Sequence, residues 1–310
     1  MSEFAREELR RFPVDCPTVL TIGNFDGVHL GHQYLVRQVM AQAEQHGMAA
    51  GAVTLYPDPV RVLRPEEPMQ YLTSLEERIE LLRGLGLDLV VPLSFTSELA
   101  ELTPRSFLGL LKEQLNLGVL VMGPDNVFGR NREGTPERVR ETGQELGFEV
   151  EVLPAPLTDG TPVSATAIRR ALAEGDLDAV TRQLGRWYSL RGPVVRGDQR
   201  GRGIGFPTAN IAVTADRAMP AFGVYATFAH VRGKRYAGAT NIGMRPTFNG
   251  QRPSVETYII DFEGDIYDDV VRIELVARLR PEQRFNGIEE IKAQIARDVE
   301  QARELLAALP

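Results

Sequence analysis

The stretch Gly23-Asn24-Phe25-Asp26-Gly27-Val28-His29-Leu30-Gly31-His32 decides the fold of the first half of this 310-residue chain. It follows the apolar run Thr18–Ile22, which predicts a strand. It precedes an apolar stripe with a spacing of four residues, which predicts a helix that ends at Gly47. Glycine lets the backbone turn tightly, and the N-terminus of a helix favours an anion. The stretch therefore predicts a phosphate-binding turn at the end of a buried strand.

Short apolar runs recur along the first half of the chain, bounded by glycine or proline. They do not alternate with polar residues, which is typical of strands buried on both faces. Between them, Ser74 with Glu77 forms a capping box, and Thr103 with Pro104 marks a helix start. Strand–helix alternation predicts a Rossmann-like α/β domain, with ligands at the carboxyl ends of a parallel sheet. The predicted strands are Thr18–Ile22, Ala49–Leu55, Leu87–Leu93, Val119–Met122 and Phe148–Leu153.

The second half has a different periodicity. After two helical segments that end at Gly185, apolar and polar residues alternate with period two. Val224–Val231 and Arg235–Thr240 predict one hairpin, and Val255–Phe262 and Val270–Leu279 predict another. Many short antiparallel strands predict a small barrel. We place a first domain at 1–185 and a second at 186–310. The chain ends in an amphipathic helix with one apolar face made of Ile288, Ile291, Ile295 and Val299.

The composition, 43% hydrophobic and 25% charged, is that of an ordinary globular protein. A formal charge of −7 argues against a general attraction to nucleic acid or to an anionic membrane. The single cysteine, Cys16, excludes an internal disulfide and favours a reducing compartment. Residues 1–15 are charged, and no run reaches the ~20 apolar residues that span a bilayer. We therefore expect a cytoplasmic protein without membrane segment, nucleic-acid ligand or obligatory protein partner.

Two of the chain's four histidines, His29 and His32, lie three residues apart in the decisive stretch. This spacing lets both rings face one bound group. A zinc pair is an alternative, although no third cysteine or histidine ligand is near in the sequence. The stretch resembles the HxGH motif of the nucleotidyltransferase superfamily, whose members join a nucleoside triphosphate to a phosphate-bearing acceptor. Preorganised donors there would stabilise the charge that gathers on the attacked phosphate.

Three more segments are similar to motifs of the bacterial bifunctional riboflavin kinase/FAD synthetase family. Residues 54–59 resemble TFxPxP, residues 123–134 resemble GxDFxFGxxRxG, and residues 163–169 resemble (I/V)SSTxIR. Three positions depart from these patterns, namely Leu55, Asn126 and Ala165. The resemblance implies that the first domain transfers an adenylyl group to FMN.

Residues 197–210, GDQRGRGIGFPTAN, form the second strong signal. Taken alone, a loop rich in glycine and arginine is also typical of a turn or of an RNA-contacting segment. Thr208 and Asn210, however, are two apart at a strand start, so we expect their oxygens to point to one side. Hard oxygen ligands of this kind suit Mg²⁺ beside phosphates.

The same passage closely resembles the riboflavin kinase motif GxxxGRxLGFPTAN, and the resemblance continues through residues 240–247, 255–262, 265–267 and 279–285. It implies that Thr208 and Asn210 bind magnesium and that Glu256 is the catalytic base. Tyr258 stands where the family often has histidine. The resemblance further implies a set of ATP-binding residues: Gly23, Asn24, Phe25, Asp26, Gly27, Gly31, Ser164, Thr166, Arg169, Gly201, Arg202, Gly205 and Pro207. The implied flavin-binding residues are Asp125, Phe128, Asn241, Arg280, Arg284 and Phe285.

We therefore expect a two-domain transferase of FAD biosynthesis, with riboflavin, FMN and ATP as substrates and Mg²⁺ as cofactor. The second domain would phosphorylate riboflavin to FMN, and the first would adenylylate FMN to FAD with release of pyrophosphate. Two alternatives are an HxGH nucleotidyltransferase for another phosphorylated acceptor joined to a flavin-binding barrel, and a non-catalytic flavin-binding regulator.

Overall fold

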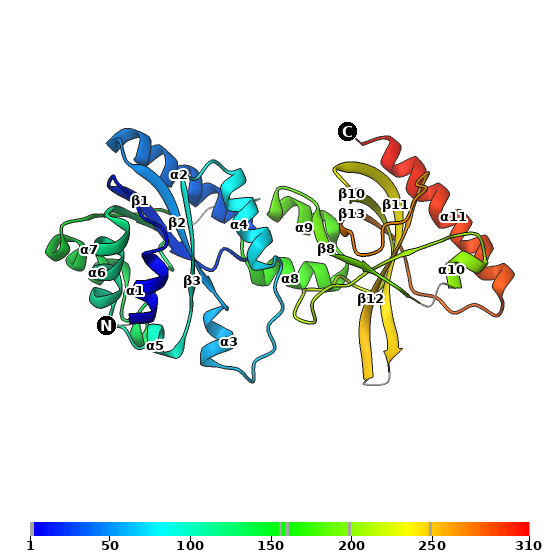
Figure 1. The fold of residues 1–310 in the computed structure, drawn as a ribbon, viewed down its shortest axis with the longest axis horizontal. Coiled ribbons are helices and arrows are strands. Elements are labelled where there is room, and N and C mark those ends of the chain that lie inside the picture. Colours follow the sequence, from blue (N-terminus) through cyan, green and yellow to red (C-terminus); the bar gives the residue numbers. More distant parts are fainter. Residues whose placement is uncertain (1–2, 155–156, 159–160, 198–199, 248–249, 310) are drawn as a thin grey trace. The chain divides into compact units, whose positions relative to one another are not determined.

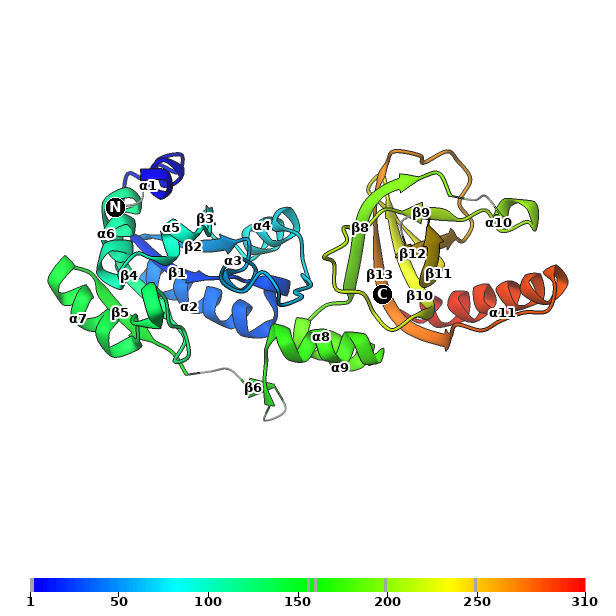
Figure 2. The same ribbon diagram turned by 90° about the horizontal axis from the view of Figure 1, so that it is seen from below.

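Five parallel strands form the sheet of the first half (Figure 1), in the order β3-β2-β1-β4-β5, which Figure 2 labels in full. The predicted strands are confirmed to within two residues at each end. Nearly all residues of the central strands are buried, as their unbroken apolar runs require. The bounds are β1 Thr18–Gly23, β2 Ala49–Tyr56, β3 Leu89–Ser94, β4 Leu117–Met122 and β5 Glu149–Val152.

Helices cover both faces of this sheet, as expected for an α/β domain. On one face, α2 (Leu30–His46) and α4 (Leu75–Gly84) pack through Val36, Val39 and Leu82. On the other face lie α1 (Glu3–Leu9), α6 (Pro104–Leu115) and α7 (Pro136–Leu146). The predicted helix signals are confirmed: the capping box begins α4, Thr103 caps α6, and Gly47 in a left-handed conformation ends α2. Shorter elements are η1 Asp26–Val28, α3 Pro59–Leu63, α5 Ser97–Ala100, η2 Arg130–Arg132, β6 Leu157–Thr158 and β7 Thr161–Pro162.

The second half forms a closed six-stranded barrel with the cyclic order β10-β11-β12-β9-β8-β13. The long helix α11 runs along β10 and β11, as Figure 1 shows in red. The strands are β8 Tyr188–Val195, β9 Ala209–Ile211, β10 Gly223–Val231, β11 Lys234–Thr247, β12 Gly250–Ile259 and β13 Val270–Pro281. The helices are α8 Ala165–Glu174, α9 Leu177–Leu184, α10 Arg200–Gly203 and α11 Ile288–Ala307.

The predicted hairpin of β10 with β11 is confirmed, but the predicted hairpin of β12 with β13 is wrong. β12 pairs with β11 and β9, whereas β13 pairs with β10 and β8. The ten residues 260–269 therefore cross the barrel rather than close a hairpin. Barrel closure explains the difference. β8 and β9 pair with each other, and the remaining edge of each strand also needs a partner, which is β13 for β8 and β12 for β9.

The two faces of the barrel wall differ in chemistry. Thr227, Thr240 and Thr257 point inward, are fully buried, and link their hydroxyl groups at 2.8 and 2.9 Å. The outward residues of β10 and β11 form a second core with Val299 and its neighbours on α11. Ile288, predicted on the same apolar face of that helix, is 63% exposed, because it lies at the helix end beyond the barrel wall.

The structure, a computed structural model, describes all residues except 1–2, 155–156, 159–160, 198–199, 248–249 and 310 (Figure 2). Contacts divide it into two compact units, Met1–Ala165 and Thr166–Pro310. By this division α8 and α9 belong with the barrel, whereas we predicted them in the first domain. The domain boundary at 185–186 stays a prediction.

Candidate active sites

In the first unit, the turn between β1 and α2 carries the two predicted histidines. Its backbone is unusual, since Phe25 and Val28 have φ values of 50° and 39° beside Gly27 at 78°. Phe25 is anchored by burial, with 1% of its side chain exposed. Left-handed conformations at non-glycine residues are strained and persist where the surroundings fix them, which is common at functional sites. The turn therefore has a single fixed shape that delivers His29 to the start of α2.

His29 and His32 lie together, with stacked rings whose centroids are 3.7 Å apart. His29 caps α2, because its Nδ1 accepts the backbone N–H of His32 at 3.3 Å. The proton of the neutral His29 ring is then on Nε2, which is a donor. Burial lowers the pKa of His32 well below its usual value, with smaller contributions from His29 and from the positive charge of Arg78. Burial therefore favours the neutral form of His32, and both rings lie at the N-terminal, positive end of α2.

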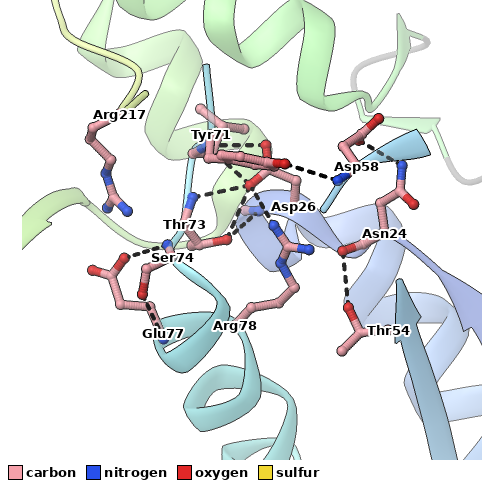
Figure 3. A network of polar contacts seen from close by, with 12 residues as sticks. Asn24, Asp26, Thr54, Asp58, Tyr71, Thr73, Ser74, Glu77, Arg78 and Arg217 are labelled. Carbon is pink, nitrogen blue, oxygen red and sulfur yellow. Dashed lines mark hydrogen bonds and ion pairs between the residues drawn. The ribbon is translucent and has the colours of Figure 1, made fainter. Parts of the chain in front are cut away.

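The side chain of Asp26 points toward the segment before α4. Its carboxylate accepts the backbone N–H groups of Leu72 and Thr73 at 3.0 Å and pairs with Arg78 at 3.3 Å (Figure 3). Asp26 is 2% exposed. The structure thus uses this predicted ATP-binding side chain to tie the turn to the segment before α4. Sequence reasoning missed Thr73 and Arg78, because neither belongs to a motif and an arginine in a helix is usually exposed.

Two more loops reach the same edge of the sheet. After β2, Asp58 accepts the side-chain amide of Asn24 at 2.7 Å, so the predicted TFxPxP-like segment contacts the predicted phosphate-binding turn. After β4, Asn126 donates to the carbonyl of Ile22 at 3.4 Å. The departure at Asn126 therefore has a structural role, since it links the third loop to the end of β1. The structure brings the three predicted motifs together at the carboxyl ends of β1, β2 and β4.

Other predicted residues of this site have varied surroundings. Asp125 is exposed in the loop after β4. Phe128 is half-buried, and its ring packs against the core residue Phe107 with centroids 5.9 Å apart. Ser164 directly precedes α8, as expected for a cap, while Thr166 and Arg169 lie in the first turns of that helix and belong to the second unit.

In the barrel, three predicted residues form one row across neighbouring strands. Glu256 on β12 is the register partner of Asn210 on β9 and of Asn241 on β11. Directly opposite residues in an antiparallel ladder lie on the same face. Because Thr257 points inward, Glu256 and its two asparagine neighbours lie on the outer face of the barrel. The fold therefore assembles a carboxylate and two amides from segments far apart in the sequence.

The glycine-rich loop before β9 fits closely over Thr208 and Asn210. A Cβ atom at Gly197 would lie 2.5 Å from the amide of Asn210, and a Cβ at Gly201 would lie 2.3 Å from the carbonyl of Phe206 and 3.5 Å from the hydroxyl of Thr208. Only glycine allows this approach. Gly205, with φ of 89°, completes the turn. The side chain of Arg202 lies outside the described residues.

A pocket of about 480 Å³ adjoins this loop. Its lining residues come from three segments, namely Pro207 and Thr208 before β9, Thr257 and Ile259 on β12, and residues 262–267 after β12. Its lining is mostly apolar with a few polar groups, which is typical of a small-molecule site. Sequence reasoning did not assign residues 262–267 to a site.

Of the remaining predicted flavin residues, Arg280 lies at the end of β13, and Arg284 and Phe285 follow the strand. The guanidinium of Arg280 is held by the buried carboxylate of Asp298 on α11, at 2.8 to 3.1 Å, and lies 5.8 Å from the ring centre of Phe285. Arg280 thus fixes the helix to the strand. Arg284 is exposed and Phe285 half-buried. Among the described residues, no group of three or more histidine, cysteine, aspartate or glutamate side chains could hold a metal ion.

Comparison with known proteins assigns the two halves separately. The family model for FAD synthetase matches residues 12–167, and the model for riboflavin kinase matches residues 184–306. A protein of Listeria monocytogenes named bifunctional riboflavin kinase/FMN adenylyltransferase is 37% identical, over 95% of this chain and 94% of the relative. Its namesakes in Bacillus subtilis and Escherichia coli are each 36% identical over 92% of this chain.

The chain belongs to the bifunctional riboflavin kinase/FMN adenylyltransferase family. The predicted family, fold class and pair of transferase activities are confirmed. A solved structure from Streptococcus pneumoniae, named as a macrolide-efflux protein, shares this family member's fold with a TM-score of 0.87 and 29% identity, over 95% of this chain and 96% of that one. Among the residues that our structure describes, none of the helices has the length and apolarity of a membrane-spanning segment.

Proposed function

We propose that this chain converts riboflavin and ATP to FMN and ADP in its barrel, and FMN and ATP to FAD and pyrophosphate in its α/β unit. The observation that carries the proposal is that each unit has its own polar cluster, and that a different family model matches each half of the chain. The two clusters share no residue, so the two transfers are assigned to two separate sites.

In the α/β unit, His29 and His32 would stabilise adenylyl transfer. The FMN phosphate attacks the α-phosphorus of ATP, a P–O bond forms, and pyrophosphate leaves with the electron pair of the broken bond. Negative charge grows on the α-phosphate oxygens, and neutral imidazole N–H donors beside a helix N-terminus stabilise it. Backbone groups of Gly23, Gly27 and Gly31 would approach the phosphates closely.

Two further roles belong to the proposal for adenylyl transfer. Ser164, Thr166 and Arg169 would hold the ATP phosphates from the start of α8, since a helix start with an arginine is a local anion site. Asn24 would contribute mainly by holding Asp58 in place. Asp125, exposed at the carboxyl end of β4, would face FMN.

In the barrel, Glu256 would act as the base. It takes the proton of the riboflavin 5′-hydroxyl while that oxygen attacks the γ-phosphorus and ADP leaves. Asn241 and Asn210, its register partners, orient the carboxylate and the reacting groups. Phosphoryl transfer depends mainly on such positioning and on charge neutralisation.

The donors around Thr208 and Asn210 fit Mg²⁺. A hydroxyl and an amide oxygen are hard ligands, and the glycine loop lies directly against both side chains. Mg²⁺ when bound would neutralise phosphate charge, with the nucleotide and water supplying its other ligands. The apolar pocket beside Pro207 would then hold a ring of one substrate.

One incubation tests the function. The protein is mixed with riboflavin, ATP and Mg²⁺, and flavins are separated by chromatography over time. We expect FMN to appear first and FAD to follow. FAD from added FMN without turnover of riboflavin would refute the kinase assignment. FMN that accumulates without FAD, including with added FMN, would refute the adenylyltransferase assignment. A reducing compartment that supplies ATP, the cytoplasm, suits both steps and the single Cys16.

A further inference from the structure

Arg78 is the largest side chain that is completely buried in the described part of the chain. Its Nη2 group lies 3.3 Å from Asp26, while its Nε and Nη1 groups have no hydrogen-bond partner among the described residues. The guanidinium lies 5.8 Å from the ring centre of Tyr56 and 5.7 Å from that of Tyr71. Removing this charge from water is costly, and well-packed apolar side chains would serve stability as well or better. The cost therefore points to a role beyond stability.

Arg78 acts on the turn after β1 through Asp26. The carboxylate of Asp26 accepts both backbone N–H groups of residues 72 and 73, and the Thr73 hydroxyl in turn accepts the N–H of Gly27 at 2.9 Å (Figure 3). This network ties the turn to the segment before α4 and to α4 itself. In the chain, the strained residues Phe25 and Val28 lie on either side of Asp26 and Gly27, and His29 follows Val28 directly.

The start of α4 sets the position of Arg78 in turn. Ser74 and Glu77 form a reciprocal capping box, which fixes the first turn of the helix immediately before Arg78. The guanidinium therefore reaches Asp26 from a rigid element rather than from a loop. A buried hydrogen-bonded charge of this kind is a strong constraint on geometry, because either partner left alone would be an unpaired buried charge.

We propose that Arg78 is a positioning residue for adenylyl transfer, which through Asp26 and Thr73 holds the turn that presents His29 and His32 to the α-phosphate of ATP. The inference rests on the proposed function of the first unit. Arg78 is completely buried, so it would act through Asp26 and Thr73 rather than directly on a substrate.

The charge of Arg78 has a second effect on the same site. The ring of His29 stacks on His32, and the positive charge of Arg78 acts on His32 from α4. Burial is the main cause that lowers the pKa of His32, and these two groups lower it further. Arg78 is itself surrounded by Asp26, Asp58 and the two tyrosines. Removing the positive charge would raise the pKa of His32, so the neutral donor would be lost at a higher pH.

The test compares Arg78→Met with Arg78→Lys in the intact chain. We expect Arg78→Met to lower kcat for FAD formation from FMN by about 10²-fold, as for a small misplacement of catalytic groups, with KM for ATP and FMN within a few-fold of the parent. The acid limb of its pH–rate profile should move to higher pH. Arg78→Lys keeps the charge and should restore the position of that limb and most of the rate.

Controls separate this role from a structural one. Arg83→Met makes the same change at an exposed position of the same helix and should leave FAD formation unchanged. Riboflavin phosphorylation by the second unit should be normal in every variant. Thr73→Val removes the hydroxyl from the network without removing charge. It should lower kcat for FAD formation about tenfold without moving the acid limb of the pH–rate profile. This variant also keeps the proposal testable if Arg78→Met does not fold.

Parent kcat in Thr73→Val, an unmoved acid limb in Arg78→Met, or no rescue by Arg78→Lys would each overturn the proposal. A parent protein that makes no FAD from FMN would instead overturn the proposed function. The two failures are therefore distinguishable.

Discussion

The first unit presents its polar groups on turns that leave the ends of strands, whereas the barrel presents them on the strands themselves. His29 stands after a strained turn, and a buried network of Asp26, Thr73 and Arg78 holds that turn in place. Glu256 needs no such support, because the ladder of β11, β12 and β9 fixes its place between two asparagines. A side chain on a turn is thus held by buried polar contacts, while a side chain on a strand is held by register.

The largest expected effect concerns the histidine pair. His29→Ala removes a donor to the developing charge and the cap of α2, so FAD formation should fall by about 10²- to 10³-fold. FMN formation, measured in the same chain with riboflavin as substrate, should stay at the parent rate.

The control for this change is His46→Ala, at the exposed end of α2, which should have no effect on either rate. An equal loss of both activities in His29→Ala would contradict separate sites. Zinc that is present in the parent and lost in the variant would revive the metal alternative for this pair.

A change at the barrel site should lower FMN formation and spare FAD formation from added FMN, the reverse of the expected effect of His29→Ala. Glu256→Gln keeps the shape of the side chain and removes its basicity, so kcat for FMN formation should fall by about 10²-fold. Adenylylation of added FMN should be unaffected, and the exposed Glu289→Gln serves as the matched control. A kcat within a few-fold of the parent would leave Glu256 as a positioning residue only.

The glycine loop offers a smaller test of register-based placement. A methyl group at Gly197 would collide with the amide of Asn210, whereas a methyl group at Gly203 meets nothing within 4 Å. We expect Gly197→Ala to slow FMN formation by about tenfold or more, because Asn210 must move, and Gly203→Ala to have no effect. Steady-state rates over a range of Mg²⁺ concentrations measure this, and equal behaviour of the two variants would count against the metal site.

The smallest effect is on stability. Because the pKa of His32 is lowered in the folded protein, the unfolded state binds the additional proton first as pH falls. The free energy of unfolding should therefore be fully retained above about pH 6.5 and decrease below it, by up to about 1.4 kcal/mol per pH unit. Urea unfolding followed by circular dichroism should give a weaker pH dependence for His32→Asn. Identical pH dependence in the two proteins would contradict the buried neutral state of His32.

Sequence reasoning reached the parts of the fold that local patterns determine. The parallel strands follow from unbroken apolar runs, and the starts of α4 and α6 follow from capping residues. The row of Asn210, Asn241 and Glu256 was reached residue by residue through resemblance to the kinase family, and the register then explains why these residues act together.

The rest depends on contacts that no local pattern records. The pairing of β12 with β9 follows from barrel closure, which is a property of all six strands at once. Arg78 is an arginine in an amphipathic helix, and only the tertiary structure reveals that its charge is buried against Asp26, 52 residues away in the sequence. Arg280, assigned to flavin by resemblance, forms an ion pair with Asp298 that no local pattern indicates, and its flavin role stays a prediction.

The most direct test of two independent centres in one chain is complementation between inactive variants. His29→Ala and Glu256→Gln are each incubated with riboflavin, ATP and Mg²⁺, and then mixed in equal amounts. Each alone should yield almost no FAD. The mixture should form FAD at a rate within a few-fold of the parent, since FMN made by one variant is adenylylated by the other. A mixture that makes no more FAD than the two variants separately, although both are folded, would contradict the account.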